Sequence, residues 1–310
     1  MKTVNRGLLL LLINATLYAL ASLGFARSGF NTSLLATWFG LLGSIIALTK
    51  LITEPKFYIF RHRKERNLYF CFLNGFIFGG ASFGLHFWSL RFILPSDSIL
   101  VNAFFSLFSS VVVEIIKEKK RPTVLSIISV LAGVIGTGLI CNPQALLSLD
   151  ILELDSLLGV ALAILSGLCF VIMISRVRNY QQYPPSWALL GYMSGTTIAG
   201  LLTYRPLSDS IQCLYFLKLI AIASMICQSI AAYCMVRGTS DVTVSGTFVI
   251  QTSSSVFTFL AQIFLFPDRI TILSTAGTAF IVASVLIQVV VLKVRERNLK
   301  SNSRCDIEIS

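Results

Sequence analysis

Ten apolar runs of roughly 20 residues follow one another along the chain, and a helix of this length crosses the hydrocarbon core of a bilayer. Hydrophobic residues make up 55% of the 310 residues, and charged residues only 13%. A soluble domain of this size needs more charge to cover its surface, so the apolar excess must face lipid. We therefore expect an all-α integral membrane protein. Its ten transmembrane helices are predicted at about 7–26, 34–52, 68–90, 97–116, 123–141, 157–175, 186–204, 214–236, 242–266 and 270–292.

Basic residues are distributed unevenly between the two ends of these runs. If the amino terminus faces the cytoplasm, 20 of the 25 Lys and Arg residues fall in cytoplasmic segments. This bias follows the positive-inside rule, so both termini are predicted to be cytoplasmic. It also accounts for the net charge of +11 without a nucleic-acid partner, because the basic residues form no water-facing patch. Plasma membrane and Golgi- or ER-type membranes fit the sequence equally well.

A stretch in the first half of the chain recurs in the second half. Ser96-Asp97 corresponds to Ser240-Asp241, 144 residues later, and an apolar run follows each pair. Each half has five spans, an odd number, so the two halves enter the membrane in opposite directions. Inverted repeats of this kind are typical of alternating-access transporters, which bind substrate near the midplane. The predicted units are a first five-helix repeat at 1–145, a second five-helix repeat at 146–293 and a cytoplasmic tail at 294–310, which we expect to be disordered.

Short patterns near the ends of two spans suggest a family. The segment from Ser254 to Thr258 reads Ser-Ser-Val-Phe-Thr, and Asp268 follows. It resembles the EamA-type duplicated domain of the drug/metabolite transporter superfamily, in which Ser-Pro-x-Phe-Thr precedes a Gly-Glu pair. Here a serine and an aspartate replace the proline and the glutamate. The segment from Arg91 to Asp97 is most similar to the G subgroup of solute carrier family 35. The resemblance implies ten spans and metabolite transport, with nucleotide-sugar carriage common among relatives.

Polar side chains inside the apolar runs are costly in hydrocarbon, so they usually face a cavity or a partner helix. Asn14 and Tyr18 are four residues apart, as are Asn102 and Ser106, so each pair shares one face of a helix. A mostly neutral lining suits a polar or partly apolar organic molecule, whereas an anionic substrate favours Arg or Lys. We expect a substrate cavity lined by Asn14, Tyr18, Trp88, Asn102, Gln228 and Gln251.

Two titratable residues within the predicted spans are candidates for proton coupling. Glu114 lies near the cytoplasmic end of its helix, where two interpretations stay open. It extends to the interface and pairs with Lys117, or its membrane-embedded carboxylate exchanges a proton during transport. His86 is either a hydrogen-bonded packing residue or a group that titrates near neutral pH.

Patterns for catalysis and metal binding are missing from the sequence. It has no nucleophile elbow, zinc-protease motif or phosphate loop, and only two histidines. We therefore expect no enzyme activity, no cofactor and no metal.

These features together predict a multi-pass secondary transporter that moves a small organic metabolite by alternating access. A first alternative is a nucleotide-sugar transporter of an internal membrane, for which Arg91 or Arg237 would have to reach inward. A second alternative is a non-transporting scaffold or sensor on the same fold. The expected partners are the small-molecule substrate and the lipid bilayer. A homodimer, and a disulfide between Cys141 and Cys213, stay open.

Overall fold

The fold is known here from a computed structural model, and every regular element that it describes is helical. The all-α prediction is confirmed for these residues. Four helices are long and apolar enough to cross a membrane, and shorter apolar helices accompany them, as expected for a membrane protein. The four are Ala36–Thr53, Leu68–Ser89, Asp155–Asn179 and Thr275–Val294. The structure describes residues 2–28, 32–53, 66–89, 91–93, 95–118, 123–141, 154–179, 183–203, 219–254, 256–257, 260 and 272–308.

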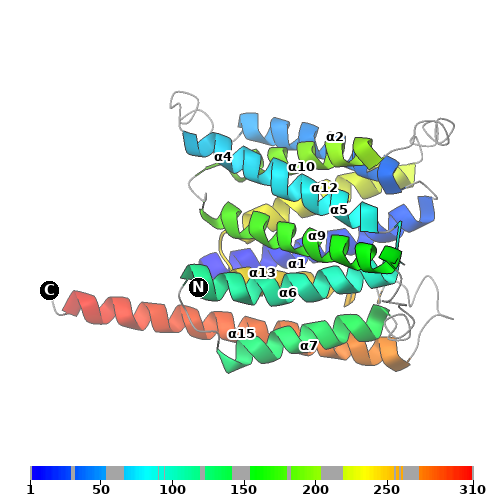
Figure 1. Ribbon diagram of the computed structural model, residues 1–310. Helices are drawn as coiled ribbons and strands as arrows, with labels where there is room; N and C mark the ends of the chain where they lie inside the picture. The colour runs from blue at the N-terminus through cyan, green and yellow to red at the C-terminus, as the bar shows by residue number, and fades with distance from the viewer. Residues whose placement is uncertain are drawn as a thin grey trace.

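Each predicted span contains helical residues, in the expected chain order (Figure 1). The helices are α1 (Lys2–Ser28), α2 (Thr32–Thr53), α4 (Arg66–Asn74), η1 (Gly75–Gly79), α5 (Gly80–Ser89), α6 (Pro95–Glu118), α7 (Val124–Cys141), α9 (Leu154–Asn179), α10 (Pro185–Thr203), α12 (Leu219–Gly238), α13 (Val244–Gln251) and α15 (Ile272–Glu308). α4, η1 and α5 are continuous and occupy a single predicted span. Counted together, they give ten helices in the described part of the chain.

The last helix is longer than the sequence predicted. α15 continues to Glu308, so the segment from residue 294 onward, which we expected to be disordered, is helical over its described part. No glycine or proline follows Gly277, and the segment is rich in Lys, Arg, Glu and Leu, which favour helix. The prediction of disorder was wrong because it considered the charge of the segment and not its helix propensity.

The bundle carries large apolar side chains outward and many polar side chains inward. Ile45 of α2, Leu131 of α7 and Leu286 of α15 are 54%, 54% and 61% exposed. Ser166 of α9 and Thr196 of α10 are, in contrast, fully buried. Lipid can cover such an apolar surface, whereas polar groups in a membrane turn toward the bundle interior. This distribution fits a membrane environment.

The contacts between α2 and α10, which pack extensively against each other, show their relative direction (Figure 1). Thr37 lies against Gly200, and Gly40, one turn later, lies against Thr197, one turn earlier. The two helices are therefore antiparallel. Each approach places a glycine against a threonine, so the two backbones come close together.

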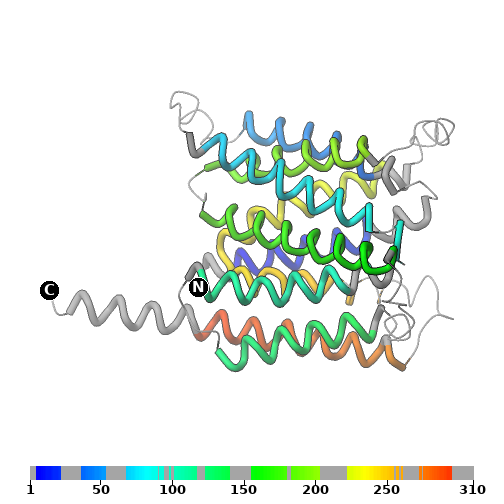
Figure 2. Tube along the Cα trace, viewed as in Figure 1, coloured from blue at the N-terminus to red at the C-terminus, as the bar shows by residue number. Residues whose placement is uncertain are grey.

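α7 and α15 form a second antiparallel pair at one edge of the bundle (Figure 2). Gly136 lies against Gly277, whereas Ser129 and Ser284 exchange two hydrogen bonds. Ser129 Oγ donates to the Ser284 carbonyl oxygen at 2.9 Å, and Ser284 Oγ donates to the Ser129 carbonyl oxygen at 2.6 Å. Both hydroxyls are thus satisfied without water, which a lipid environment requires.

Glycines allow α10 to pack closely against the continuous helix α4–η1–α5. A Cβ atom at Gly195 would lie 2.3 Å from the carbonyl oxygen of Phe76, and one at Gly191 would lie 2.1 Å from that of Phe72. Only residues without a side chain permit this approach. The segment Gly75–Gly79 is a π-helix, which the sequence did not predict. This packing fixes α5 against α10.

Replacing Gly195 by alanine should destabilise the fold by about 1–3 kcal/mol, because the new methyl group would overlap a backbone oxygen. Thermal unfolding of the purified protein in detergent measures the effect as a lower unfolding temperature. Gly84→Ala is the matched control on the same interface, since its added Cβ would lie 3.2 Å from the Cβ of Ala199 and clear of backbone atoms. Equal losses of stability in the two variants would contradict this account.

Candidate functional site

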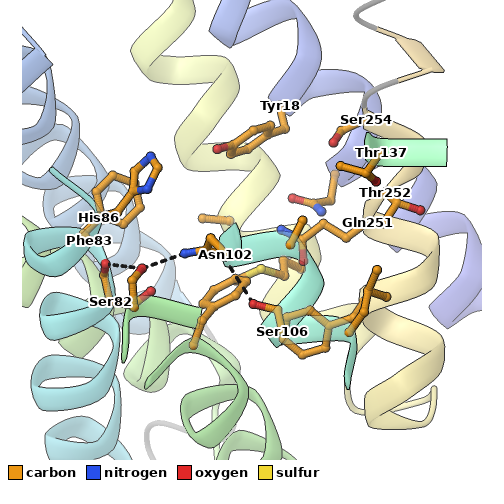
Figure 3. Close-up of a pocket in the computed structure, with 18 of the residues that line it drawn as sticks. Tyr18, Ser82, Phe83, His86, Asn102, Ser106, Thr137, Gln251, Thr252 and Ser254 are labelled. Atoms are coloured by element: carbon orange, nitrogen blue, oxygen red, sulfur yellow. Dashed lines mark hydrogen bonds between the residues drawn. The ribbon is translucent and has the colours of Figure 1, made fainter. Parts of the chain in front are cut away.

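A cavity of about 210 Å³ lies inside the bundle, lined by residues of α1, α5, α6, α7, α9, α10, α12 and α13. Its lining includes five of the six residues that the sequence singled out. In Figure 3, side chains from α1, α5, α6 and α13 project toward a common space. The predicted residues that the structure brings together here are Asn14, Tyr18, Asn102, Gln228 and Gln251, and His86 joins them.

Trp88 is the sixth candidate, and it does not line the cavity. Its side chain is 40% exposed on α5. Successive residues of a helix are rotated by about 100°, so Trp88 and His86 point in roughly opposite directions. Because His86 faces the cavity, Trp88 faces away from it. The expectation for Trp88 is therefore corrected.

Three amide side chains at the cavity have an atom without a hydrogen-bond partner among the described residues. These atoms are Asn14 Nδ2, Gln228 Oε1 and Gln251 Oε1. Asn14 is 2% exposed and Gln228 is 7% exposed. Leaving such a group unpaired costs about 1–3 kcal/mol, and lipid offers it no partner. Each of the three atoms is itself fully buried, although the side chains to which they belong line the cavity.

Asn102 differs from these three because both ends of its amide are bonded (Figure 3). Its Nδ2 donates to Ser166 Oγ of α9 at 2.7 Å, and its Oδ1 accepts from Ser106 Oγ at 3.3 Å. Ser166 Oγ donates in turn to the carbonyl oxygen of Ser82 in α5, at 2.8 Å. The chain of hydrogen bonds joins α5, α6 and α9, so Asn102 holds the cavity wall in place.

Ser166 and Ser82 are cavity residues that the sequence did not identify. A serine in an apolar run commonly bonds to its own helix, so its type alone does not mark it as a lining residue. The neighbouring Gly167 was the one sequence feature that could have indicated a close helix contact at Ser166. A Cβ atom there would lie 2.9 Å from Ser106 Oγ, so the small pair in α9 permits close contact with α6.

Aromatic rings form the apolar part of the lining. Phe83 and Tyr192 have ring centroids 6.0 Å apart, and Phe170 meets Phe248 edge to face with centroids 5.5 Å apart. All four rings line the cavity, as does Tyr18. The sequence could not select them, because 23 phenylalanines are spread over the whole chain.

His86 belongs to a polar cluster between α5 and α6 as well as to the cavity lining. Its Nδ1 lies 3.1 Å from Ser98 Oγ, with which it is hydrogen-bonded. Ser98 Oγ is also hydrogen-bonded to Ser89 Oγ. Such bonds fix the orientation of the imidazole ring, as expected for the packing histidine that the sequence offered as one interpretation.

Glu114 lies away from the cavity, in the contact between α6 and α13. It is 6% exposed and accepts a hydrogen bond from Ser245 Oγ, in the first turn of α13. Its carboxylate is therefore buried against another helix, and both interpretations, pairing with Lys117 and proton exchange, stay predictions. The side chain of Lys117, its proposed partner, lies outside the described residues. The sequence could not reveal Ser245, which is 131 positions further along the chain.

No group of three or more His, Cys, Asp or Glu side chains that could hold a metal occurs among the described residues. Cys71, Cys169, Cys227 and Cys234 are free thiols. The side chains of Cys141 and Cys213, whose pairing the sequence left open, lie outside the described part of the structure. The lining thus offers amides, hydroxyls, one imidazole and aromatic rings, a set suited to binding.

Comparisons with known proteins inform the fold. No family model matches the chain, and no curated protein matches it. A solved structure described as "Crystal structure of protein" is similar, with a TM-score of 0.71 and 16% sequence identity. The superposition covers 94% of this chain and 98% of the other. Nearly the whole chain therefore shares the architecture of a protein that is distant in sequence.

Ser166→Ala should destabilise the bundle by about 1–3 kcal/mol, because it leaves the amide of Asn102 and the carbonyl oxygen of Ser82 without their partner. The unfolding temperature in detergent measures the loss. Ser110→Ala is the control: its hydroxyl is also buried but donates only to the carbonyl oxygen of Leu107 in its own helix. We expect a smaller effect there. If Ser110→Ala proved the more damaging, the chain of hydrogen bonds would not be what holds the wall.

Proposed function

We propose that the protein is a multi-pass secondary transporter that moves a small organic metabolite across a membrane by alternating access. The observation that carries the proposal is the internal cavity and its unpartnered amides. Asn14 comes from the first half of the chain, and Gln228 and Gln251 come from the second. A transporter of this kind binds its substrate near the midplane, between its two halves.

The pattern of helix contacts supports two inverted halves. With α4–η1–α5 counted as one helix, the counterparts five positions apart are α1 and α9, α2 and α10, α5 and α12, α6 and α13, and α7 and α15. If each helix is replaced by its counterpart, the contact between α1 and α12 becomes a contact between α9 and α5. In the same way, the contact between α6 and α9 becomes a contact between α13 and α1. All four contacts occur. The pairs α2–α10 and α7–α15 map onto themselves and are antiparallel. An axis in the membrane plane would relate the halves in this way.

The proposed orientation places both termini in the cytoplasm. α1 begins, and the apolar part of α15 ends, at the same end of the bundle (Figure 1). The bias of Lys and Arg toward this end assigns it to the cytoplasm under the positive-inside rule.

The two alternatives receive less support. A nucleotide sugar carries phosphates, for which Arg or Lys in the cavity would be expected. Arg176 instead lies over the ring of Phe78, 4.8 Å from its centroid, and Arg237 lines a separate, small pocket beside Tyr183. A scaffold or sensor would need no internal cavity with unpaired amides, and these are costly to keep.

Uptake by proteoliposomes tests the proposal directly. The purified chain is reconstituted into vesicles, and the vesicles are incubated with a broad mixture of metabolites before their contents are analysed by mass spectrometry. Transport predicts that some compounds accumulate faster than in protein-free vesicles. Equal contents in the two preparations would favour the scaffold.

Replacing Asn14 or Gln251 by leucine should abolish uptake without lowering the amount of protein in the membrane. Leucine removes the amide, and its side chain has the same number of heavy atoms and the same branching as that of asparagine. Uptake is measured in proteoliposomes and normalised to reconstituted protein. Trp88→Leu is the control, because Trp88 does not line the cavity, and it should transport like the wild type. Unchanged uptake in both amide variants would remove them from the substrate site.

Glu114→Gln should preserve uptake and its response to an imposed proton gradient. Glutamine retains an oxygen that can accept the hydrogen bond of Ser245, and position 114 does not line the cavity. The test compares uptake with and without a pH gradient across the vesicle membrane. A gradient response that is present in the wild type and absent from the variant would instead assign proton coupling to Glu114.

A further inference from the structure

The described part of the cavity lining carries no formal charge. None of the described residues that line it is Lys, Arg, Asp or Glu, and its only imidazole, that of His86, is hydrogen-bonded to Ser98. A charged ligand would lose its hydration on entry without gaining a counter-ion, and this desolvation is strongly unfavourable. The lining therefore favours a molecule without net charge.

The amide side chains of the lining indicate what the edge of that molecule must offer. Asn14, Gln228 and Gln251 line the cavity, and each side-chain amide has both a donor and an acceptor. A ligand that satisfies all three carries donors and acceptors on the same small framework. Amide-like ring edges have this arrangement, and Asn and Gln side chains pair with such edges in nucleobase recognition.

The aromatic part of the lining favours a flat ligand. Phe83, Phe170 and Phe248 offer rings without any polar atom, and Tyr18 and Tyr192 offer rings with one hydroxyl each. Aromatic side chains stack on the π-faces of heterocyclic bases whichever base is present. A planar ring could therefore cover these apolar surfaces with its faces while its edge meets the amides.

The volume of the cavity limits the size of the ligand. About 210 Å³ is smaller than the roughly 300–1,000 Å³ of pockets that hold drug-sized ligands. This space suits a molecule with between a nucleobase's and a nucleoside's number of atoms.

From these four observations we infer that the substrate is an uncharged, planar heteroaromatic compound with amide-like donors and acceptors on its ring edge. The inference rests on the proposed transport function, because it assigns the cavity to the transported molecule. The side-chain amides of Asn14, Gln228 and Gln251 pair with the donors and acceptors of the ring edge.

Binding and transport are tested separately, with the same compounds. Uracil, adenine, nicotinamide and uridine represent uncharged heteroaromatics. Uridine monophosphate adds charge to uridine, and glucose is uncharged but not planar. Binding to the purified protein in detergent is measured as an increase in unfolding temperature over a range of concentrations, and transport as uptake into proteoliposomes.

We expect one or more of the heteroaromatics to stabilise the protein and enter the vesicles, and uridine monophosphate and glucose to do neither. Gln228→Met and Gln251→Met have nearly unchanged volume but lack the amide, so each should weaken binding about tenfold or more. Trp88→Leu should bind like the wild type. Wild-type affinity in both methionine variants would overturn the assignment of the amides.

The remaining outcomes separate the substrate class from the transport function. If uridine monophosphate or glucose binds and enters while the heteroaromatics do not, the substrate class is wrong and transport stands. If a heteroaromatic binds with dependence on Gln228 but nothing enters the vesicles, the class stands and transport is wrong. If none of the six compounds binds or enters, the inferred substrate class is overturned, and the metabolite-mixture experiment then decides on transport alone.

Discussion

The structure depends on the lack of hydrogen-bonding solvent inside a bilayer. Every buried polar group must then find its partner within the bundle. Many hydroxyls bond to their own helix, as Thr196 does to the Tyr192 carbonyl oxygen at 2.9 Å and Ser229 to that of Met225 at 2.8 Å. Others join two helices, as Ser129 and Ser284 do. Amides need more partners than a hydroxyl, so the unpaired atoms around the cavity are amide atoms.

Close packing and the cavity are two consequences of where small and large residues lie. Glycines bring α10 against α2 and against α4–η1–α5, so these backbones leave no room between them. Around the cavity, Phe170 and Phe248 hold α9 and α13 apart, because their rings meet edge to face across the gap. The rings also make the space partly apolar. The residues that keep the cavity open thus also determine what it can bind.

The sequence predicted the helices well because a membrane span is a local property, set by the length and hydrophobicity of one run. Most of the polar residues that it singled out line the cavity, since a polar side chain in an apolar run usually faces a cavity or a partner helix. The prediction for Trp88 was wrong because an aromatic side chain can pack against lipid as well as line a cavity. Ser166 and the partner of Glu114 could not be predicted, because each depends on a contact between distant helices.

The contact between Glu114 and Ser245 joins two helices that would move relative to each other in the proposed mechanism. In the proposed inverted repeat α6 and α13 are counterparts, and both line the cavity, at Leu107 and Phe248. Glu114 lies two turns beyond Leu107, and Ser245 lies about one turn before Phe248, so their bond lies toward one end of the cavity. Alternating access requires that end to open in another state. In the proposed mechanism the hydrogen bond between Glu114 and Ser245 would then break, so its energy would favour the arrangement that contains it.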